Sequence, residues 1–554
     1  MTDRRLKTVL FVTAATVYAV VGYWLQVRNG FILGDALSRT ASAQSVLFSR
    51  QPHLAAIGFI FTPLTAMAQL PLVALSPWWS DLTSHAFAGS VVSAVFMAGA
   101  AVQLMSMGTD RGLSREYVLL VTVLFAANPM IVFYGSNGMS EAPFVFFIVW
   151  AVRRLTRWMA DDDVHHLIVA GGIAMALAYL TRYDAVACVA AAGALVGITT
   201  YRRARTPPRV RRALLDVLLV SGPGATAFLG WAFASWLITG EALAQFTSEY
   251  GNAAVLRQSG GGATDVAGGL TFSLVCIALL APTLALLVAW AAVGARDRLS
   301  RQMLLPAIVL FGAALAFQTL TYATGSTFPF LRFYITAIPF AACMALMAVP
   351  EGQPAPAWGR GRYAPAARRG DGGGLPRRGY VIAAVFAVCV PVAGWAMSQP
   401  AYAPQEFALA AVLDPEPDSV SPAKAEQRRV ATTFSTERRL AQYLDDLQLP
   451  EGSVITDTMY GFAVVAASHN PKIYVVPSDR DFVRLLNAPS AGSVRYLLAV
   501  PNTGRGAADA VNMRYPTLYE TGSEVATLEL EIPNQAENQP TYRLYRVNEP
   551  LPAT

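Results

Sequence analysis

Charged side chains are scarce in this chain. Asp, Glu, Lys and Arg make up only 14% of its 554 residues, hydrophobic residues make up 54%, and the mean hydropathy is +0.41. A soluble protein usually has about 25% charged residues, so this composition excludes an ordinary soluble domain. Several apolar runs reach the roughly 20 residues that a helix needs to cross a bilayer. We therefore expect a polytopic protein embedded in a lipid bilayer. Its net charge of +6 does not indicate nucleic-acid binding, because the arginines lie mainly in short loops between these runs.

Cysteine and histidine are also few. The four cysteines lie within apolar runs, lack the spacing of metal ligands, and are expected to pack as small hydrophobic residues: Cys188, Cys276, Cys343 and Cys389. The five histidines form no HExxH or similar cluster. The sequence therefore predicts no protein-bound metal site.

Eleven apolar runs predict membrane spans, with boundaries near 8–27, 84–107, 116–134, 141–158, 165–181, 184–200, 213–238, 268–293, 303–322, 333–349 and 380–398. The first run lacks a clear small-residue cleavage site, so we expect a retained helix and not a removed signal peptide. Residues 55–79 are apolar too, but Pro63, Pro71 and Pro77 interrupt them. We expect interfacial or re-entrant helices there, outside the membrane.

Arginines alternate between the predicted loops. With the N-terminus inside, the cytoplasmic loops hold most of them, whereas the opposite loops before residue 400 hold few Arg and no Lys. The positive-inside rule then places the N-terminus in the cytoplasm of a plasma (inner) membrane and the C-terminus outside. Residues 350–379 are rich in Gly, Pro, Ala and Arg, and are expected to form a disordered cytoplasmic linker within the membrane domain, 1–400.

The composition changes after Pro400. Strand patterns alternate with helical ones: helices at 435–447, 461–468 and 482–486, and strands at 453–456, 473–476, 494–500, 527–532 and 542–547. This alternation predicts a small extracytoplasmic α/β domain, residues 401–554.

Polar residues at the span ends gather on the outer face in this topology: Asp35, Arg39, Asn137, Glu141, Arg182, Tyr183, Asp184, Glu241, Glu249 and Arg332. The cytoplasmic face has basic loops but no comparable mixture of acids and bases. An extracytoplasmic polar cavity is the simplest interpretation.

Asp35 is the best candidate for chemistry. A carboxylate just beyond the first span can take the proton from an acceptor hydroxyl that attacks a sugar carbon. The alternative is an N-cap for a helix beginning at Ala36.

The arginines are candidates for phosphate binding. Arg332 can pair with a lipid phosphate through its planar fork, or anchor the span at the interface beside Phe333 and Tyr334. Arg182 can form a second phosphate contact, with Tyr183 and Asp184 touching the sugar, or make a local ion pair with Asp184.

Several further residues are substrate-binding candidates. Glu141 either contacts substrate or stabilises the first turn of its span. His53 is either an interfacial side chain or a substrate contact. The set is completed by Arg39, Asn137 and Tyr334.

These segments resemble the GT-C superfamily of membrane glycosyltransferases, which includes protein O-mannosyltransferases, aminoarabinose transferases and actinobacterial cell-envelope transferases. The resemblance covers residues 1–400. It rests on Asp35 in the first outer loop, the interfacial helices, and three short segments: Asn128-Pro129 to Glu141, Thr181-Arg182-Tyr183-Asp184 and Arg332-Phe333-Tyr334. It implies a polyprenyl-phosphate sugar donor, a catalytic aspartate at Asp35, and inversion at the anomeric carbon. Several members carry two adjacent acids where this chain has Gly34-Asp35-Ala36, which leaves the need for a divalent cation open.

We therefore expect a glycosyltransferase that moves a sugar from polyprenyl phosphate to an extracytoplasmic glycan, lipid or protein. One alternative is a flippase or transporter of a lipid-linked precursor, and another is a scaffold whose outer domain recruits partners. Transporters often show inverted repeats and charges at the membrane midplane. Here the charges lie at one face and no repeat is found, which favours the enzyme.

Overall fold

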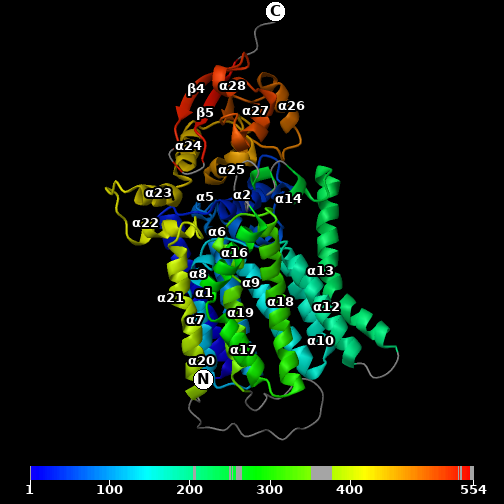
Figure 1. Cartoon of the computed structure of the whole chain (residues 1–554). Helices are drawn as coiled ribbons and strands as arrows, with labels where there is room; N and C mark the ends of the chain where they lie inside the picture. Colours follow the sequence, from blue (N-terminus) through cyan, green and yellow to red (C-terminus); the bar gives the residue numbers. More distant parts are fainter. Residues whose placement is uncertain are drawn as a thin grey trace, which may run out of the picture.

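The computed structural model describes residues 2–203, 208–248, 251, 254–256, 265–350, 377–534, 536 and 539–548. Most of the predicted linker, together with Glu249, lies outside these residues. Long helices stand side by side in the lower part of Figure 1, a layer of short helices lies above them, and a small sheet lies at the top. The first helix starts at the end of the bundle farthest from the sheet.

Helices occupy all eleven predicted span positions. In chain order they are α1 (Asp3–Gly22) with its π-helical extension Tyr23–Arg28, α6 (Phe87–Asp110), α7 (Arg115–Ala126) with α8 (Pro129–Tyr134), α9 (Glu141–Asp161), α10 (Val164–Leu167) with the π-helical Ile168–Met175 and α11 (Ala176–Tyr179), α12 (Ala185–Arg203), α13 (Arg209–Thr239), α16 (Val266–Leu280) with α17 (Leu284–Gly294), α18 (Arg298–Ala323), α19 (Ala337–Ala348), and α20 (Arg377–Ala387) with α21 (Cys389–Met397). Within the described chain, seven are long and apolar enough to cross a membrane, or eight if α16 and α17 form one span. The protein is thus a multi-pass membrane protein. Crossing by 116–134, 141–158 and 165–181 stays a prediction.

Two predicted spans are interrupted at prolines. The run 116–134 divides into α7 and α8 because Pro129 starts a new helix, capped by the Asn128 side chain, which accepts a hydrogen bond of 3.1 Å from the backbone N–H of Met130. The run 268–293 bends by 70° between α16 and α17, where Pro282 lies. The sequence analysis did not predict either break.

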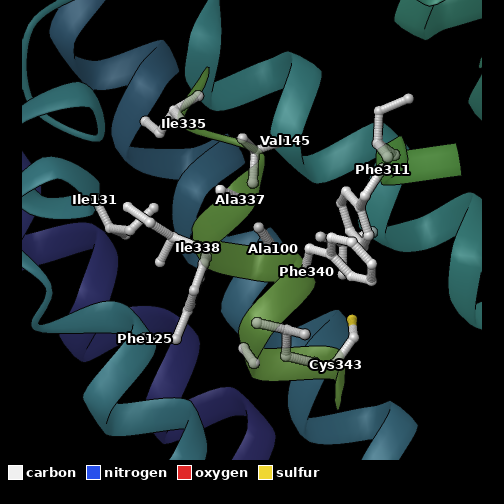
Figure 2. Close-up of a cluster of buried hydrophobic side chains, with 14 of the residues drawn as sticks. Ala100, Phe125, Ile131, Val145, Phe311, Ile335, Ala337, Ile338, Phe340 and Cys343 are labelled. Carbon is white, nitrogen blue, oxygen red and sulfur yellow. The ribbon is translucent and has the colours of Figure 1, made fainter. Parts of the chain in front are cut away.

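Helix α19 lies at the centre of the bundle, and all twelve of its residues are buried. Its Phe340 stacks on Phe311 of α18 with 5.6 Å between ring centroids. Figure 2 shows Phe125 and Val145 from two other helices beside the same segment. A helix that is apolar all round must be enclosed by other helices. Helix α19 therefore lies at the centre of the hydrophobic core.

The segment between α1 and α6 forms a layer on the end of the bundle. Its main helix, α2 (Gly34–Phe48), is followed by a 3₁₀ turn, Leu54–Ile57, and three helices of four residues each: α3 (Leu64–Met67), α4 (Leu70–Val73) and α5 (Asp81–Ser84). Such short helices are far below the length that crosses a bilayer. This agrees with the expectation that residues 55–79 form no span.

The C-terminal part contains a mixed five-stranded sheet in the order β2 (Tyr474–Val475), β1 (Val454–Ile455), β3 (Tyr496–Ala499), β5 (Tyr542–Val547) and β4 (Ala526–Ile532). The first three strands are parallel, and β5 is antiparallel to both β3 and β4. The accompanying helices are α24 (Ser435–Asp446), α25 (Thr458–Ala467), α26 (Phe482–Asn487), α27 (Ala510–Arg514) and α28 (Leu518–Thr521). All five strands were predicted, and the α/β prediction is confirmed.

Residues 401–431 belong physically to the helical bundle. Phe407, Val412 of α22 (Ala410–Leu413), and Ala431 at the end of α23 (Pro422–Ala431) join the hydrophobic core of the membrane helices. The α/β fold proper therefore starts at α24.

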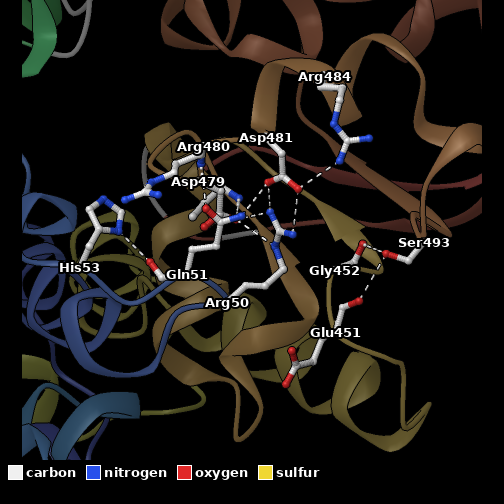
Figure 3. Close-up of polar contacts among 11 residues, drawn as sticks. Arg50, Gln51, His53, Glu451, Gly452, Asp479, Arg480, Asp481, Arg484 and Ser493 are labelled. Carbon is white, nitrogen blue, oxygen red and sulfur yellow. Dashed lines mark hydrogen bonds and ion pairs between the residues drawn. The ribbon is translucent and has the colours of Figure 1, made fainter.

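The sheet domain packs on the bundle through α2. Leu37 and Ala41 of α2 pack with Ala463 and Ala466 of α25. Just beyond α2, the side chain of Arg50 forms ion pairs with Asp479, at 3.2 Å, and with Asp481 of the sheet domain (Figure 3). The segment between α1 and α6 and the C-terminal domain are thus one packed unit.

Candidate active site

Asp35 lies in the first turn of α2, at the boundary between bundle and sheet domain. The helix begins at Gly34 and its N-cap is Leu33, so the alternative role of Asp35 as the N-cap is wrong. A carboxylate in the first turn is stabilised by the helix dipole. Its Oδ2 accepts a hydrogen bond from Nη2 of Arg332 at 3.1 Å, and its side chain is 40% exposed. The carboxylate is therefore anchored at one oxygen and accessible.

A cavity of about 950 Å³ lies beside Asp35. Six predicted site residues line it: Asp35, Arg39, Arg182, Tyr183, Asp184 and Arg332. They come from α2, from the turn between α11 and α12, and from the start of the α19 segment. The fold brings together charged groups that are far apart in the sequence.

Arg182 is held by two carboxylates. Its guanidinium lies 2.8 Å from Oε1 of Glu141 and 2.8 Å from Oδ2 of Asp184. The predicted local pair with Asp184 is present. Because Glu141 neutralises it as well, Arg182 has less positive charge to offer a ligand than Arg39. Arg332 is also flanked by two carboxylates, Asp35 at 3.1 Å and Glu141 at 4.0 Å.

Arg39 and Arg332 keep donor capacity. Arg39 donates to the backbone oxygen of Asp35 at 3.0 Å and lies 4.2 Å over the ring of Phe61, but forms no ion pair at salt-bridge distance with a described carboxylate. In Arg332, Nε is buried without a hydrogen-bond partner among the described residues. Guanidinium groups with unused N–H donors suit a phosphate.

The charge on Asp35 is maintained by its neighbours. Burial acts to raise the pKa of the Asp35 carboxyl, but Arg332, Arg39 and Arg182 act against it, and the pKa falls below its ordinary value. Asp35 is therefore ionised at neutral pH.

The other predicted residues lie apart from the cavity lining. Glu141 is buried under Arg182 at the start of α9. Asn137 shapes a turn by accepting a hydrogen bond from the backbone N–H of Met139. Tyr334 hydrogen-bonds Ser273 of α16 at 2.6 Å. Nδ1 of His53 lies 2.7 Å from the backbone oxygen of Gln51. Their contacts are those of residues that support the site.

Sequence reasoning missed several lining residues, above all Arg505 of the sheet domain, and also Phe61, Gln318 and Gln405. Arg505 follows β3, and nothing in its local sequence relates it to Asp35. Only the packing of the two parts places it there.

No group of three or more His, Cys, Asp and Glu side chains in the described chain is placed to hold a metal ion.

Comparison with solved structures identifies the fold of the chain. No family model matches the chain, and no curated protein sequence matches it. The chain is similar in fold to a solved membrane protein, so the predicted fold class, a GT-C-like helical polytopic membrane protein with a small C-terminal α/β domain, is confirmed. The likeness rests on ArnT from Cupriavidus metallidurans, solved bound to undecaprenyl phosphate: the TM-score is 0.53, the identity is 13%, and 97% of each chain is covered.

Two archaeal structures are more distant. The oligosaccharyltransferase from Archaeoglobus fulgidus in complex with Zn and sulfate has a TM-score of 0.41 at 11% identity, over 89% of this chain and 68% of that one. AglB from the same organism, with an inhibitory peptide and a dolichol-phosphate, has a TM-score of 0.38 at 10% identity, over 88% and 69%.

Proposed function

We propose that this protein is a glycosyltransferase that moves a sugar from a polyprenyl phosphate to an acceptor hydroxyl on the extracytoplasmic side of the membrane. The observation that carries the proposal is the carboxylate of Asp35, paired with Arg332 and flanked by Arg39, on the wall of a cavity of about 950 Å³. The likeness to a transferase solved with undecaprenyl phosphate supports the lipid-phosphate donor.

Arg332 and Arg39 would hold the donor phosphate. Both are almost fully buried, so their charges act in a medium of low dielectric constant where they interact strongly with an anion. As the bond between the sugar C1 and the phosphate oxygen breaks, the electron pair leaves with the phosphate. The two guanidinium groups stabilise the charge that develops there.

Asp35 would accept the proton of the acceptor hydroxyl. The acceptor oxygen forms the new bond to C1 on the face opposite the departing phosphate, which inverts the anomeric carbon, and its proton passes to the carboxylate. The Oδ1 atom has no hydrogen bond with a described residue, so it is available. A donor phosphate that competes for Arg332 weakens the Asp35 ion pair. The carboxylate thereby becomes more basic when the donor is bound.

The decisive variant is Asp35→Asn. Asn keeps the size of the side chain and can still accept from Arg332, but it cannot take a proton. We expect the purified variant to bind a short-chain polyprenyl-phosphate sugar normally and to lose transfer by ~100-fold or more. Transfer to acceptors in membrane extracts would be followed by mass spectrometry.

The same variant separates the enzyme from the flippase. Lipid flipping needs no general base, so a flippase would still translocate a fluorescent lipid-linked sugar in vesicles at the wild-type rate and show no transfer in either form. Near-normal transfer by Asp35→Asn would exclude Asp35 as the base.

A further inference from the structure

A second cavity, of about 340 Å³, lies between α2 and the sheet domain. It shares Asp35, Ile60, Phe61 and Arg505 with the larger cavity. Asp35 therefore lies where the two cavities meet. The larger cavity lies among the membrane helices and the smaller one lies under the sheet domain. A transferase that inverts the anomeric carbon needs two such approaches, because the acceptor must reach this carbon from the side opposite the donor phosphate.

The wall that α2 contributes to the second cavity is a row of hydroxyl groups. Ser38, Ser42 and Ser45 are four and three residues apart, so they share one face of the helix. All three are half-buried, and none forms a side-chain hydrogen bond with a described residue. Buried or half-buried hydroxyls normally find partners, so this row is suited to the hydroxyls of a carbohydrate.

The opposite wall belongs to the sheet domain. Thr458 and Tyr460 begin α25, which follows β1, and Arg505 follows β3. These residues thus lie at the carboxyl ends of adjacent parallel strands, the edge where α/β sheets commonly bind ligands.

Arg505 is the positive charge at this junction. It lies 5.2 Å over the ring of Tyr460, and its Nε is buried with no hydrogen-bond partner among the residues that the structure describes. No carboxylate in the described part of the chain forms an ion pair with it, in contrast to Arg182 and Arg332 at the donor side. A half-buried guanidinium with no counter-ion among the described residues, facing a cavity lined in part by serine hydroxyls, indicates an anionic ligand.

We propose that the cavity between α2 and the sheet domain is the acceptor subsite, and that it takes a glycan carrying an acidic group, which Arg505 binds. This rests on the proposed transferase function and names its acceptor class. The serine row contacts the sugar hydroxyls, and Arg505 orients the acid group so that one hydroxyl points toward Asp35. The acid can be a carboxylate or a phosphate, since both match the guanidinium fork.

The test uses the full-length protein in detergent, with saturating farnesyl phosphate to fill the donor phosphate site. Three soluble probes are titrated by ligand-observed NMR: trigalacturonate, maltotriose 1-phosphate and neutral maltotriose. We expect wild type to bind at least one charged probe about tenfold more tightly than maltotriose, the scale of a charge-assisted hydrogen bond. The tighter charged probe tells which acid the site takes.

Three variants make the result specific. Arg505→Gln should remove the preference for charge, Arg505→Lys should keep part of it, and Arg484→Gln, at an exposed arginine of the same domain, should leave it unchanged. Thermal unfolding of each variant reports that it is folded. Equal binding of all three probes to wild type, or a preference that survives in Arg505→Gln, would overturn the proposal.

The transferase function and the anionic acceptor subsite can be refuted independently of each other. Asp35→Asn should keep the probe preference while losing transfer, because it leaves Arg505 in place. Wild type that prefers the charged probe but transfers no sugar would refute the transferase and leave the anionic subsite standing. Wild type that transfers sugar but shows no preference for the charged probe would refute the anionic subsite and leave the transferase function standing.

Discussion

The charge of Asp35 and the charges of Arg39 and Arg332 stabilise one another. The arginines keep Asp35 ionised, and Asp35 balances part of the positive charge that burial would otherwise make costly. An incoming phosphate changes this balance at Arg332 first, since that residue contacts Asp35 directly at 3.1 Å. In the proposed mechanism, binding of the donor and activation of the base are therefore coupled through one side chain.

Substitutions of Arg332 test this coupling. Arg332→Ala should weaken binding of a short-chain polyprenyl phosphate by about tenfold or more, because charge-assisted hydrogen bonds are lost. Arg332→Lys should weaken it less, since it keeps the charge and loses the fork. Binding would be measured by ligand-induced thermal stabilisation, with Arg296→Ala at an exposed arginine of the opposite end as the control. If neither substitution changed binding, Arg332 would be an interfacial anchor.

Asp509, outside the membrane spans, provides a test of pH dependence. Burial, and then the neighbouring Asp457, raise the pKa of Asp509 to about 8. The folded protein therefore holds a proton that the unfolded chain releases above the ordinary pKa of 3.8. Stability contributed by this group is full below that value and declines as pH rises through about 8.

The variant Asp509→Asn should reduce this decline. Asn can still accept the hydrogen bond that Asp509 receives from the backbone N–H of Val511, but it stays neutral. We expect its unfolding temperature to fall less than that of wild type between pH 6 and pH 9, by about 2–4 °C for each kcal/mol of repulsion removed. Scanning calorimetry of the purified protein would measure it. Parallel curves for the two proteins would contradict the raised pKa.

Among the helices and strands, α2 contributes to both cavities and to the contact with the sheet domain. It presents Asp35 and Arg39 to one cavity, its serines to another, and its apolar face to α25. The chain beyond its end is fixed by Arg50, whose guanidinium lies between Asp479 and Asp481 (Figure 3). Burial raises the pKa of Asp479, and the hydrogen bond from the backbone N–H of Val476 and the charge of Arg50 act against this rise.

Loss of this contact should loosen the sheet domain from the first outer loop. In Arg50→Ala we expect faster amide hydrogen exchange at residues 49–53 and 476–484, because a carboxylate without exposed side-chain surface loses its partner, at a cost of about 3 kcal/mol. Arg484→Ala, which removes only an exposed arginine from Asp481, should leave exchange unchanged. Equal exchange in both variants would show that the Arg50 pairs contribute nothing.

At the scale of the whole molecule, the site requires a defined orientation in the membrane. The first outer loop, the turn at Arg182 and the sheet domain lie at the same end of the bundle, and α1 begins at the other end (Figure 1). The arginine distribution predicts that the sheet domain is extracytoplasmic.

Reporter fusions would test this orientation. A periplasm-active reporter fused after Ser398 should be active, and the same reporter inserted within 370–374 should be inactive, while a cytoplasm-active reporter should give the opposite pattern. Both positions on the same side would refute the eleven-span topology and the outer location of Asp35.

Composition and periodicity were sufficient to predict where the membrane helices and the five strands lie. Apolar runs located the helices, and alternation located all five strands, because burial in lipid or in a sheet imposes a pattern on neighbouring residues. They did not predict the breaks at Pro129 and Pro282, since a proline in a membrane helix is tolerated when surrounding helices compensate.

The sequence by itself determined that this is a multi-pass membrane protein with an α/β C-terminal part, and it singled out Asp35, Arg182 and Arg332, because charges beside apolar runs stand out locally. Only the tertiary structure decided how they pair: Arg182 with Glu141 and Asp184, Arg332 with Asp35, and Arg505 across from α2. Ion pairs and cavity walls depend on contacts between segments distant in the chain. A pattern of neighbouring residues contains no information about which of its charges is already neutralised.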